Sequence, residues 1–294
     1  RSFPIKKNNS EIEYEFQNYY KGGFPVLCSS GRVAIMLILK SFLPSNNKKI
    51  GIFPFASTCV REAILKFTDF SVNKQDNNIS YNQWGYQNAA KGSNYLIEDS
   101  ADTLTEINTN IFSNTKSNFI IWSLPKILGT HSGSIIWCRN IEDSKLLKSI
   151  ISSSKPKMFI LILKILSHYN MFFYNLWNKK IYNNVNLNKI ELSEIFYKTK
   201  QLKSIISDRK RKILLFNSIN KNKHILKNNF YPSVIPLEKN KYKTYEKFLK
   251  SSFGLRHFLF SNENEYVKVF PLPIHQDISY EKLKEFKECF YDKK

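Results

Sequence analysis

The stretch Ile120–Trp137, IIWSLPKILGTHSGSIIW, places a lysine between two short apolar runs. The runs are rich in isoleucine and tryptophan, which favour strands, so we expect strands over 117–124 and 132–138. Lys126 follows the first strand and opens a loop that contains two glycines. A buried ammonium group is costly to desolvate. This lysine is therefore either a solvated residue at a strand end or a residue that is present for its amine.

Outward from this stretch, apolar runs alternate with helical patterns from residue 22 to about 140. We expect helices over 31–43 and 58–67 and further strands over 49–55 and 94–99. Strands separated by helices indicate a parallel sheet with crossover helices. The predicted class is α/β, with a mostly parallel central sheet and flanking helices.

The remaining chain predicts a helical segment and a small second domain. Residues 141–224 contain no glycine and have helical patterns throughout. A proline-marked junction is followed by an expected helix over 242–254, two strands and a closing helix over 279–290. We therefore predict a large α/β domain over 1–224 and a small C-terminal α+β domain over 225–294.

Composition limits the classes of partner. The chain of 294 residues has 45 Lys and Arg against 24 Asp and Glu, a formal net charge of +21, which favours anionic partners. The basic residues are spread along the chain, whereas a nucleic-acid footprint would gather them on one face or motif, so we expect no nucleic-acid partner. The four cysteines form no CxxC pair. They predict a reducing compartment and no metal site.

The first residues lack the apolar core of a secretory signal, and we expect a cytoplasmic protein. The most apolar segment, 158–177, is interrupted by polar residues that gather on one helical face, which predicts an amphipathic helix. This helix would pack on the body or on a second subunit. The alternative is a peripheral membrane contact, favoured by the neighbouring lysines at 155, 157, 179 and 180.

Three groups that carry chemistry come at the ends of predicted strands, where α/β sheets bind ligands. Ser30 and Gly31 begin a helix, whose free N–H groups and dipole favour a phosphate. Asp99 ends one strand and Lys126 ends the next. A phosphate cradle, a carboxylate and an amine are what a pyridoxal phosphate site needs. The amine must be partly neutral, and we expect desolvation in a cationic setting to lower its pKa.

Five motifs in this order make the sequence recognisable. They are SSG at 29–31, P-x-x-S-T at 54–58, IEDSAD at 97–102, KILGTHSGSII at 126–136 and LPIHQDISYEKL at 272–283. The sequence resembles the DegT-type (DegT/DnrJ/StrS) sugar aminotransferases, pyridoxal-phosphate enzymes of fold type I. The resemblance extends from about residue 22 to the C-terminus, and it implies a homodimer with the active site at the subunit interface.

The resemblance also implies site residues. Lys126 matches the lysine that binds the cofactor as a Schiff base and moves the proton. Asp99 matches the aspartate that faces the pyridine nitrogen. The matched phosphate-binding residues are Ser30, Gly31 and Arg32, with Ser123 as an additional hydroxyl.

The chain departs from the family at several positions. Arg32 stands where a small residue is usual, and Asp102 where His or Gln is usual near the substrate. Near Thr58, where an aromatic residue often stacks on the cofactor, this chain has no aromatic side chain, although Phe53 and Phe55 are close. The candidate substrate residues are Asp102, Thr58, His131 and Arg256.

The resemblance implies transfer of an amino group from glutamate to a keto group of a nucleotide-linked sugar, for surface polysaccharide or glycoconjugate biosynthesis. Two alternatives stay open because the pocket is altered. One is a different reaction of the same cofactor, such as sugar dehydration. The other is a catalytically altered or non-catalytic member of the family that serves as a subunit or binds a membrane surface.

Overall fold

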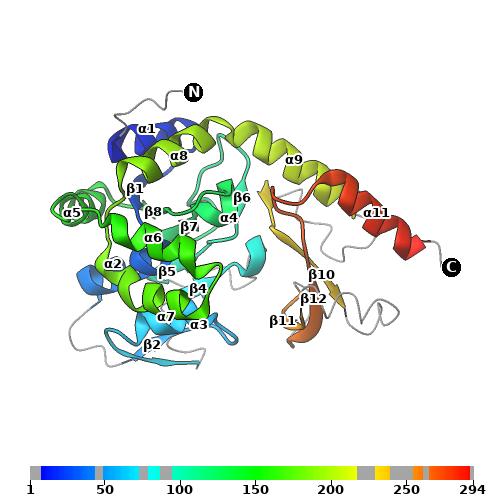
Figure 1. Ribbon diagram of the computed structural model, residues 1–294, viewed down its shortest axis with the longest axis horizontal. Coiled ribbons are helices and arrows are strands. Elements are labelled where there is room, and N and C mark those ends of the chain that lie inside the picture. Colours follow the sequence, from blue (N-terminus) through cyan, green and yellow to red (C-terminus); the bar gives the residue numbers. More distant parts are fainter. Residues whose placement is uncertain are drawn as a thin grey trace.

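The computed structural model describes residues 8–43, 49–72, 79–86, 95–216, 229–238, 254–260 and 265–291. Its centre is a five-stranded sheet with the strand order β1-β8-β7-β5-β4 (Figure 1). The strands are β1 (Phe24–Cys28), β4 (Ile79–Tyr81), β5 (Ile97–Asp99), β7 (Phe119–Ser123) and β8 (Ser134–Cys138). The predicted α/β class is confirmed.

Four of these strands run in one direction and β8 runs against them. The pairs β4–β5 and β5–β7 are parallel, whereas β8 pairs in antiparallel register with both β7 and β1. A parallel crossover needs a dozen residues or more. The connection from β7 to β8, residues 124–133, is shorter than that and reverses the chain.

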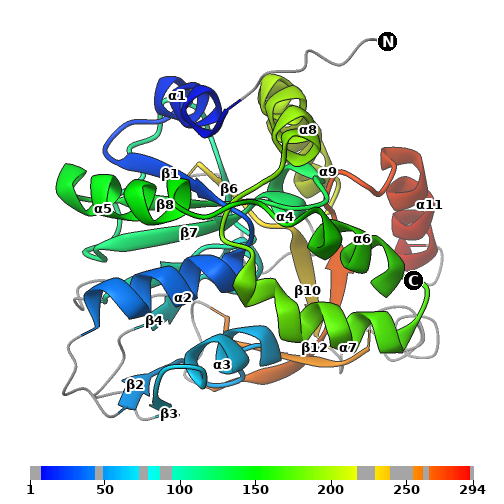
Figure 2. The same ribbon diagram turned by 60° about the vertical axis from the view of Figure 1, so that its left-hand side comes forward.

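Helices cover both faces of the sheet (Figure 2). The helices of the large body include α1 (Asn9–Tyr19), α2 (Gly31–Phe42), α3 (Thr58–Ile64), α4 (Leu124–Leu128), α5 (Ile141–Ser152), α6 (Met158–Ser167), α7 (Met171–Lys180), α8 (Lys189–Lys200) and α9 (Leu202–Leu215). Along β7, Ile120 and Trp122 join the core under α1 and α8, while Phe119 and Ile121 join the core under α2. This alternation follows from the two-residue period of a strand.

The sequence did not predict α1, β1 or β4, and it overextended the strands predicted over 49–55 and 94–99, the second of which is β5. The strand expected over 49–55 is the short β2 (Lys49–Gly51), which pairs in parallel with β3 (Asp69–Ser71) outside the main sheet. The helical character predicted for 141–224 is present as far as Leu215, the end of α9, and residues 217–224 lie outside the described ranges.

The segment 158–177 is two helices, α6 and α7, which pack side by side (Figure 2). The single helix predicted there is wrong because the chain breaks at Asn170, whose side chain accepts a hydrogen bond from the Phe172 amide at 2.7 Å and begins α7. Within the described ranges, no helix has the length and apolar character needed to cross a bilayer.

The C-terminal part forms a three-stranded antiparallel sheet with one helix against α9 (Figure 1). Its elements are β10 (Val234–Glu238), β11 (Arg256–Phe258), β12 (Val267–Pro273) and α11 (Tyr280–Tyr291). A short pair, β6 (Leu104–Thr105) with β9 (Phe230–Tyr231), joins it to the large body. The predicted domain boundary at 224/225 lies outside the described residues, as does the helix predicted over 242–254 up to residue 253.

Gly133 connects two parts of the fold that hold predicted site residues. Its N–H donates to the Ser29 carbonyl at 2.8 Å, and its own carbonyl accepts from the Leu124 N–H at 3.1 Å. Its φ is +104°, and an added Cβ would lie 2.7 Å from Ile195 Cδ1 and 2.9 Å from Leu124 Cδ1. Only glycine fits this position without displacing buried side chains.

We expect Gly133→Ala to lower the free energy of unfolding by about 1–3 kcal/mol, through overpacking and backbone strain. Denaturant unfolding of the cofactor-free protein measures this. Gly31→Ala is the matched control, because the Cβ added there meets no atom closer than Ile121 Cγ2 at 4.0 Å. Equal unfolding free energies for the two variants would show that Gly133 has no special role.

Candidate active site

Two cavities meet at Lys126. The first has a volume of about 300 Å³ and lies between the sheet and helices α2, α6 and α7. The second has a volume of about 650 Å³ and is an open cleft toward the C-terminal sheet. The residues that line both are Ser57, Tyr81, Pro125 and Lys126. The amine of Lys126 can therefore reach a group held in either cavity.

Lys126 lies on a short helix, α4 (Leu124–Leu128), that directly follows β7. Pro125 occupies the first turn, where its missing N–H costs no hydrogen bond. Gly129 ends the helix in the left-handed region with φ +71°, and its N–H donates to the Pro125 carbonyl at 3.1 Å. Leu124, Ile127 and Leu128 of α4 are held in the core, so this turn presents Lys126 to the cavities.

The ammonium of Lys126 forms an ion pair with Asp102, at 2.9 Å from Nζ to Oδ2. The Asp102 side chain is 9% exposed and that of Lys126 is 49% exposed. Burial lowers the pKa of Lys126, but the charges of Asp102 and the nearby Asp99 raise it by more, and the pKa lies above its usual value. The lowered pKa that we predicted is therefore wrong for the cofactor-free protein. The reason is the carboxylate at the position where the family usually has His or Gln.

Asp99, at the end of β5, carries a buried carboxyl group. It is 5% exposed, and Oδ1 accepts a hydrogen bond from the Ala101 N–H at 3.2 Å. Among the described residues it forms no ion pair. Burial raises the pKa of Asp99 to about 6, against the opposing effect of Lys126. A protonated ring nitrogen of a ligand in the first cavity would supply the missing partner.

The N-terminus of α2 forms the other end of the first cavity. Ser30 caps the helix, and its hydroxyl accepts from the Val33 N–H at 3.3 Å. Ser30, Gly31 and Arg32 all line the cavity, and Ser123 and Ser132 add two hydroxyl groups. Free N–H groups, hydroxyl groups and a guanidinium together suit a phosphate.

The structure separates the four candidate substrate residues into two pairs. Asp102 and Arg256 line the second cavity, as do His275 and Gln276. His131 and Thr58 line neither cavity. The His131 ring is 63% exposed and pairs with Glu194 at 2.7 Å, and the Thr58 hydroxyl accepts from Arg61 at 3.4 Å.

Some residues that line the cavities were missed by sequence reasoning. Tyr81 lies beside Asp99 in the β4–β5 register, and its ring stacks on Phe53 with centroids 4.3 Å apart. It brings an aromatic ring to the first cavity from β4, whereas the sequence led us to look for one near Thr58, at the start of α3. Lys164 and Trp177 reach the same cavity from α6 and α7. The only sequence signal for this tyrosine is its two-residue spacing from Ile79, which places both side chains on the same face of a strand.

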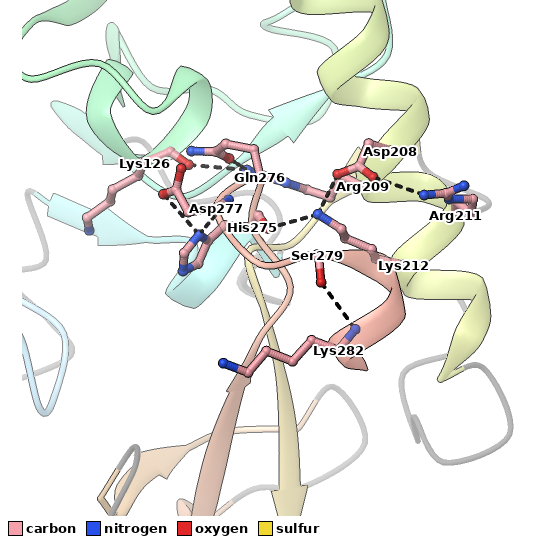
Figure 3. A network of polar contacts seen from close by, with 10 residues as sticks. All are labelled: Lys126, Asp208, Arg209, Arg211, Lys212, His275, Gln276, Asp277, Ser279 and Lys282. Carbon is pink, nitrogen blue, oxygen red and sulfur yellow. Dashed lines mark hydrogen bonds and ion pairs between the residues drawn. The ribbon is translucent and has the colours of Figure 1, made fainter. Parts of the chain in front are cut away.

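Arg209 on α9 links the motif at 272–283 to α4, the short helix that carries Lys126 (Figure 3). The Arg209 side chain is fully buried, and Nη2 donates to the Lys126 carbonyl at 3.2 Å and to Gln276 Oε1 at 2.7 Å. Burial lowers the pKa of Arg209 to about 10. The C-terminal carbonyls of a helix favour a cation, so Arg209 fixes α4 against the C-terminal part of the chain.

In the described part of the chain, no group of three or more His, Cys, Asp or Glu side chains could hold a metal ion. The first cavity instead offers the three contacts of pyridoxal phosphate. The helix N-terminus suits its phosphate, the carboxyl of Asp99 its ring nitrogen and the amine of Lys126 its aldehyde. The residues present therefore fit this cofactor.

Comparison with known proteins also indicates a protein that binds pyridoxal phosphate. A family model described as "Putative PLP-dependent aminotransferase" matches residues 12–290. Among solved structures, Helicobacter pylori PseC, an aminotransferase involved in the biosynthesis of pseudoaminic acid, is similar with a TM-score of 0.61 at 12% identity. This match covers 96% of this chain and 90% of PseC. No curated protein matches the chain by sequence.

Two further structures share the fold at low identity. S. venezuelae DesV has a TM-score of 0.64 at 11% identity, over 98% of this chain and 89% of DesV. A DegT DnrJ EryC1 StrS aminotransferase from Brucella abortus has a TM-score of 0.60 at 12% identity, over 97% of this chain and 90% of that protein. The fold of this chain is thus that of the pyridoxal-phosphate-dependent aminotransferases.

Proposed function

Because the chain belongs to the pyridoxal-phosphate-dependent aminotransferases, we propose that it transfers an amino group from glutamate to a keto group of a nucleotide-linked sugar. The observation that carries the proposal is the position of the Lys126 amine between two cavities of different character. One suits a small, rigid cofactor, and the other is wide enough for a larger polar substrate.

Each residue of the first cavity has a distinct task in this proposal. Ser30, Gly31 and Ser123 bind the phosphate of the cofactor, and Asp99 keeps a proton on its pyridine nitrogen. When bound, pyridoxal phosphate serves as an electron sink that stabilises negative charge on the substrate carbon and carries the amino group between two half-reactions. Lys126 would hold the cofactor through its amine and, once freed by the amino donor, would move a proton at the substrate carbon.

Asp102 has its task when Lys126 is displaced. A free lysine amine that has taken up a proton needs a counter-charge in a partly buried site. Asp102 Oδ2 lies 2.9 Å from Nζ and provides it, while the Ser233 hydroxyl donates to Oδ1 at 3.4 Å. Asp102 would therefore keep Lys126 close to both cavities during the time when the lysine is not attached to the cofactor.

The second cavity supports a nucleotide-linked sugar as the substrate class. Its volume of about 650 Å³ lies within the range of small-molecule sites. Arg256 offers a cation for a diphosphate or a carboxylate, and the formal net charge of +21 raises the local concentration of anions. PseC, which has the same fold and is an aminotransferase involved in the biosynthesis of pseudoaminic acid, adds to this support.

The proposal is tested in two half-reactions. L-Glutamate added alone to the cofactor-loaded protein should release one equivalent of 2-oxoglutarate per active site. A panel of nucleotide-linked keto sugars, added afterwards, should contain a member that takes up the amine. Dehydration of a sugar without any transfer of nitrogen would instead favour the alternative reaction of the same cofactor.

Replacing the counter-ion of Lys126 should change the pH dependence of cofactor capture. Attack on an aldehyde needs the neutral amine, and Asp102 raises the pKa of Lys126. We expect Asp102→Asn to shift the half-maximal rate of cofactor attachment to lower pH. Stopped-flow absorbance after mixing with pyridoxal phosphate measures the rate. Glu142→Gln, at an exposed carboxylate on α5, is the control, and identical pH profiles for both variants would contradict the assignment.

Several finer predictions remain proposals. The homodimer and the role in surface polysaccharide or glycoconjugate biosynthesis rest on the family resemblance. The cytoplasmic location rests on the cysteine pattern, which predicts a reducing compartment. A peripheral membrane contact through 158–177 is supported by the exposed faces of α6 and α7, where Phe159, Met171 and Phe172 are more than half exposed. No acidic residue occurs from 144 to 190, a pattern that suits an anionic surface.

A further inference from the structure

Two cations from separate elements line the first cavity near the N-terminus of α2. Arg32 belongs to α2 itself, whereas Lys164 comes from α6. Both lie over the ring of Trp177, a residue of α7, with Arg32 Cζ 5.0 Å and Lys164 Nζ 5.7 Å from the ring centroid. The indole therefore brings two positive charges together at one end of the cavity.

Neither cation has a carboxylate in direct contact among the residues that the structure describes. Arg32 donates to the side-chain oxygen of Asn178, and Lys164 donates to the backbone carbonyl of His131. Both acceptors are neutral. Burial, and to a lesser degree the charge of Arg32, lowers the pKa of Lys164, against the opposing effect of more distant Glu191 and Glu194. Two neighbouring cations with neutral acceptors leave positive charge that an anion can balance.

The anion that fits this end of the cavity is a phosphate dianion. The N-terminus of α2 adds free N–H groups and the positive end of its dipole. Ser30 and Ser132 line the same cavity. A ligand that carries a phosphate at one end and a ring beside Asp99 at the other would place two negative charges against Arg32 and Lys164.

We propose that Lys164, together with Arg32, binds the cofactor phosphate, so that helices α6 and α7 of the same chain complete the cofactor cavity. Lys164 is the new element of this site, because it lies far along the sequence from the phosphate-binding turn at Ser30. The inference rests on the cofactor site described above. Trp177 sets the position of both cations, and charge-assisted contacts to a phosphate are stronger than neutral ones.

The test compares two ligands that differ only in the phosphate. The full chain, stripped of cofactor, is titrated with pyridoxal phosphate and with pyridoxal, and binding is followed by absorbance. We expect Lys164→Ala to weaken pyridoxal phosphate binding by about tenfold to a hundredfold, the range of one charged hydrogen bond. Pyridoxal binding should change by less than about twofold, because pyridoxal has no group for Lys164 to contact.

Matched variants separate this role from a structural one. Lys157→Ala changes an exposed lysine that caps α6 and lines neither cavity, and it should leave both affinities unchanged. Lys164→Arg keeps the charge and should retain most of the affinity for pyridoxal phosphate. Inorganic phosphate should compete with pyridoxal phosphate in the wild type and lose that ability in the double variant of Arg32 and Lys164 to alanine.

Two results would overturn the inference. Equal loss of affinity for both ligands in Lys164→Ala would assign the residue to packing, and unchanged affinity for both would remove it from the site. In either case, wild-type binding of pyridoxal phosphate that depends on Lys126 would leave the cofactor site itself intact. The failure of this inference is thus distinguishable from the failure of the proposed function.

Discussion

Lys126→Ala should reduce turnover with L-glutamate by about 10⁴-fold or more. General acid–base catalysis by one side chain contributes about 10²–10⁴-fold, and Lys126 also supplies the covalent contact in the proposed mechanism. The variant should still bind pyridoxal phosphate without a covalent bond, because the α2 N-terminus and Asp99 remain. Single-turnover release of 2-oxoglutarate, measured beside the absorbance of the bound cofactor, separates loss of chemistry from loss of binding.

Two further variants make this result specific. Lys126→Arg keeps a cation beside Asp102 but has no amine that can be deprotonated at ordinary pH, so the same loss is expected. Lys116→Ala changes an exposed lysine just before β7 and should turn over like the wild type. Activity of Lys126→Ala within about tenfold of the wild type would remove this lysine from the chemistry.

Asp99→Asn should have opposite effects on activity and on the stability of the cofactor-free protein. An amide cannot hold a proton on the pyridine nitrogen as a carboxylate does, and loss of one fixed electrostatic partner in a water-excluded site lowers turnover by about 10²–10³-fold. The same change removes a buried carboxylate that forms no ion pair with any residue that the structure describes. Loss of activity should therefore be accompanied by a gain in stability at neutral pH.

The direction of the stability change follows from the pKa of Asp99. Its folded-state pKa is about 6, above the ordinary value of 3.8, so between these values the folded protein binds more protons than the unfolded chain. Stability from this group therefore falls as pH rises from about 4 to 6. A shift of this size corresponds to about 3 kcal/mol. The stability of Asp99→Asn relative to the wild type should rise by up to that amount between pH 4 and pH 8.

Denaturant unfolding at several pH values, without cofactor, measures this difference. Asp69→Asn is the matched control, because Asp69 is an exposed aspartate on β3 that lines neither cavity. If the stability difference between Asp99→Asn and the wild type did not change with pH, the pKa of Asp99 would not be raised in the folded protein.

Sequence reasoning identified the residues that strand order brings together. The turn at Ser30 follows β1, Asp99 ends β5, and Ser123 ends β7, directly before Lys126. Since β1, β5 and β7 run in the same direction, their ends meet at one edge of the sheet. The predicted strands were enough to bring Asp99 and Lys126 together there. Ser30 was identified from its place at the start of a helix, because β1 was not predicted. The polar residues at these ends then indicate the chemistry.

Other features of the site depend on side-chain packing across long separations in the sequence. The ion pair of Asp102 with Lys126 reverses the expected direction of the lysine pKa, and no local pattern indicates that the two side chains touch. His131 was a candidate because it follows the lysine, but Glu194 on α8 draws it away from both cavities. Lys164 reaches the cavity because Asn170 breaks the chain into two helices that fold back together.

The most direct test of the central claim is to locate the covalent contact with the cofactor. The wild-type protein is loaded with pyridoxal phosphate, reduced with borohydride, digested and analysed by mass spectrometry. The account predicts the reduced cofactor on Lys126 in the wild type and no modification of that peptide in Lys126→Ala. Modification of a different lysine, or of none, would contradict it.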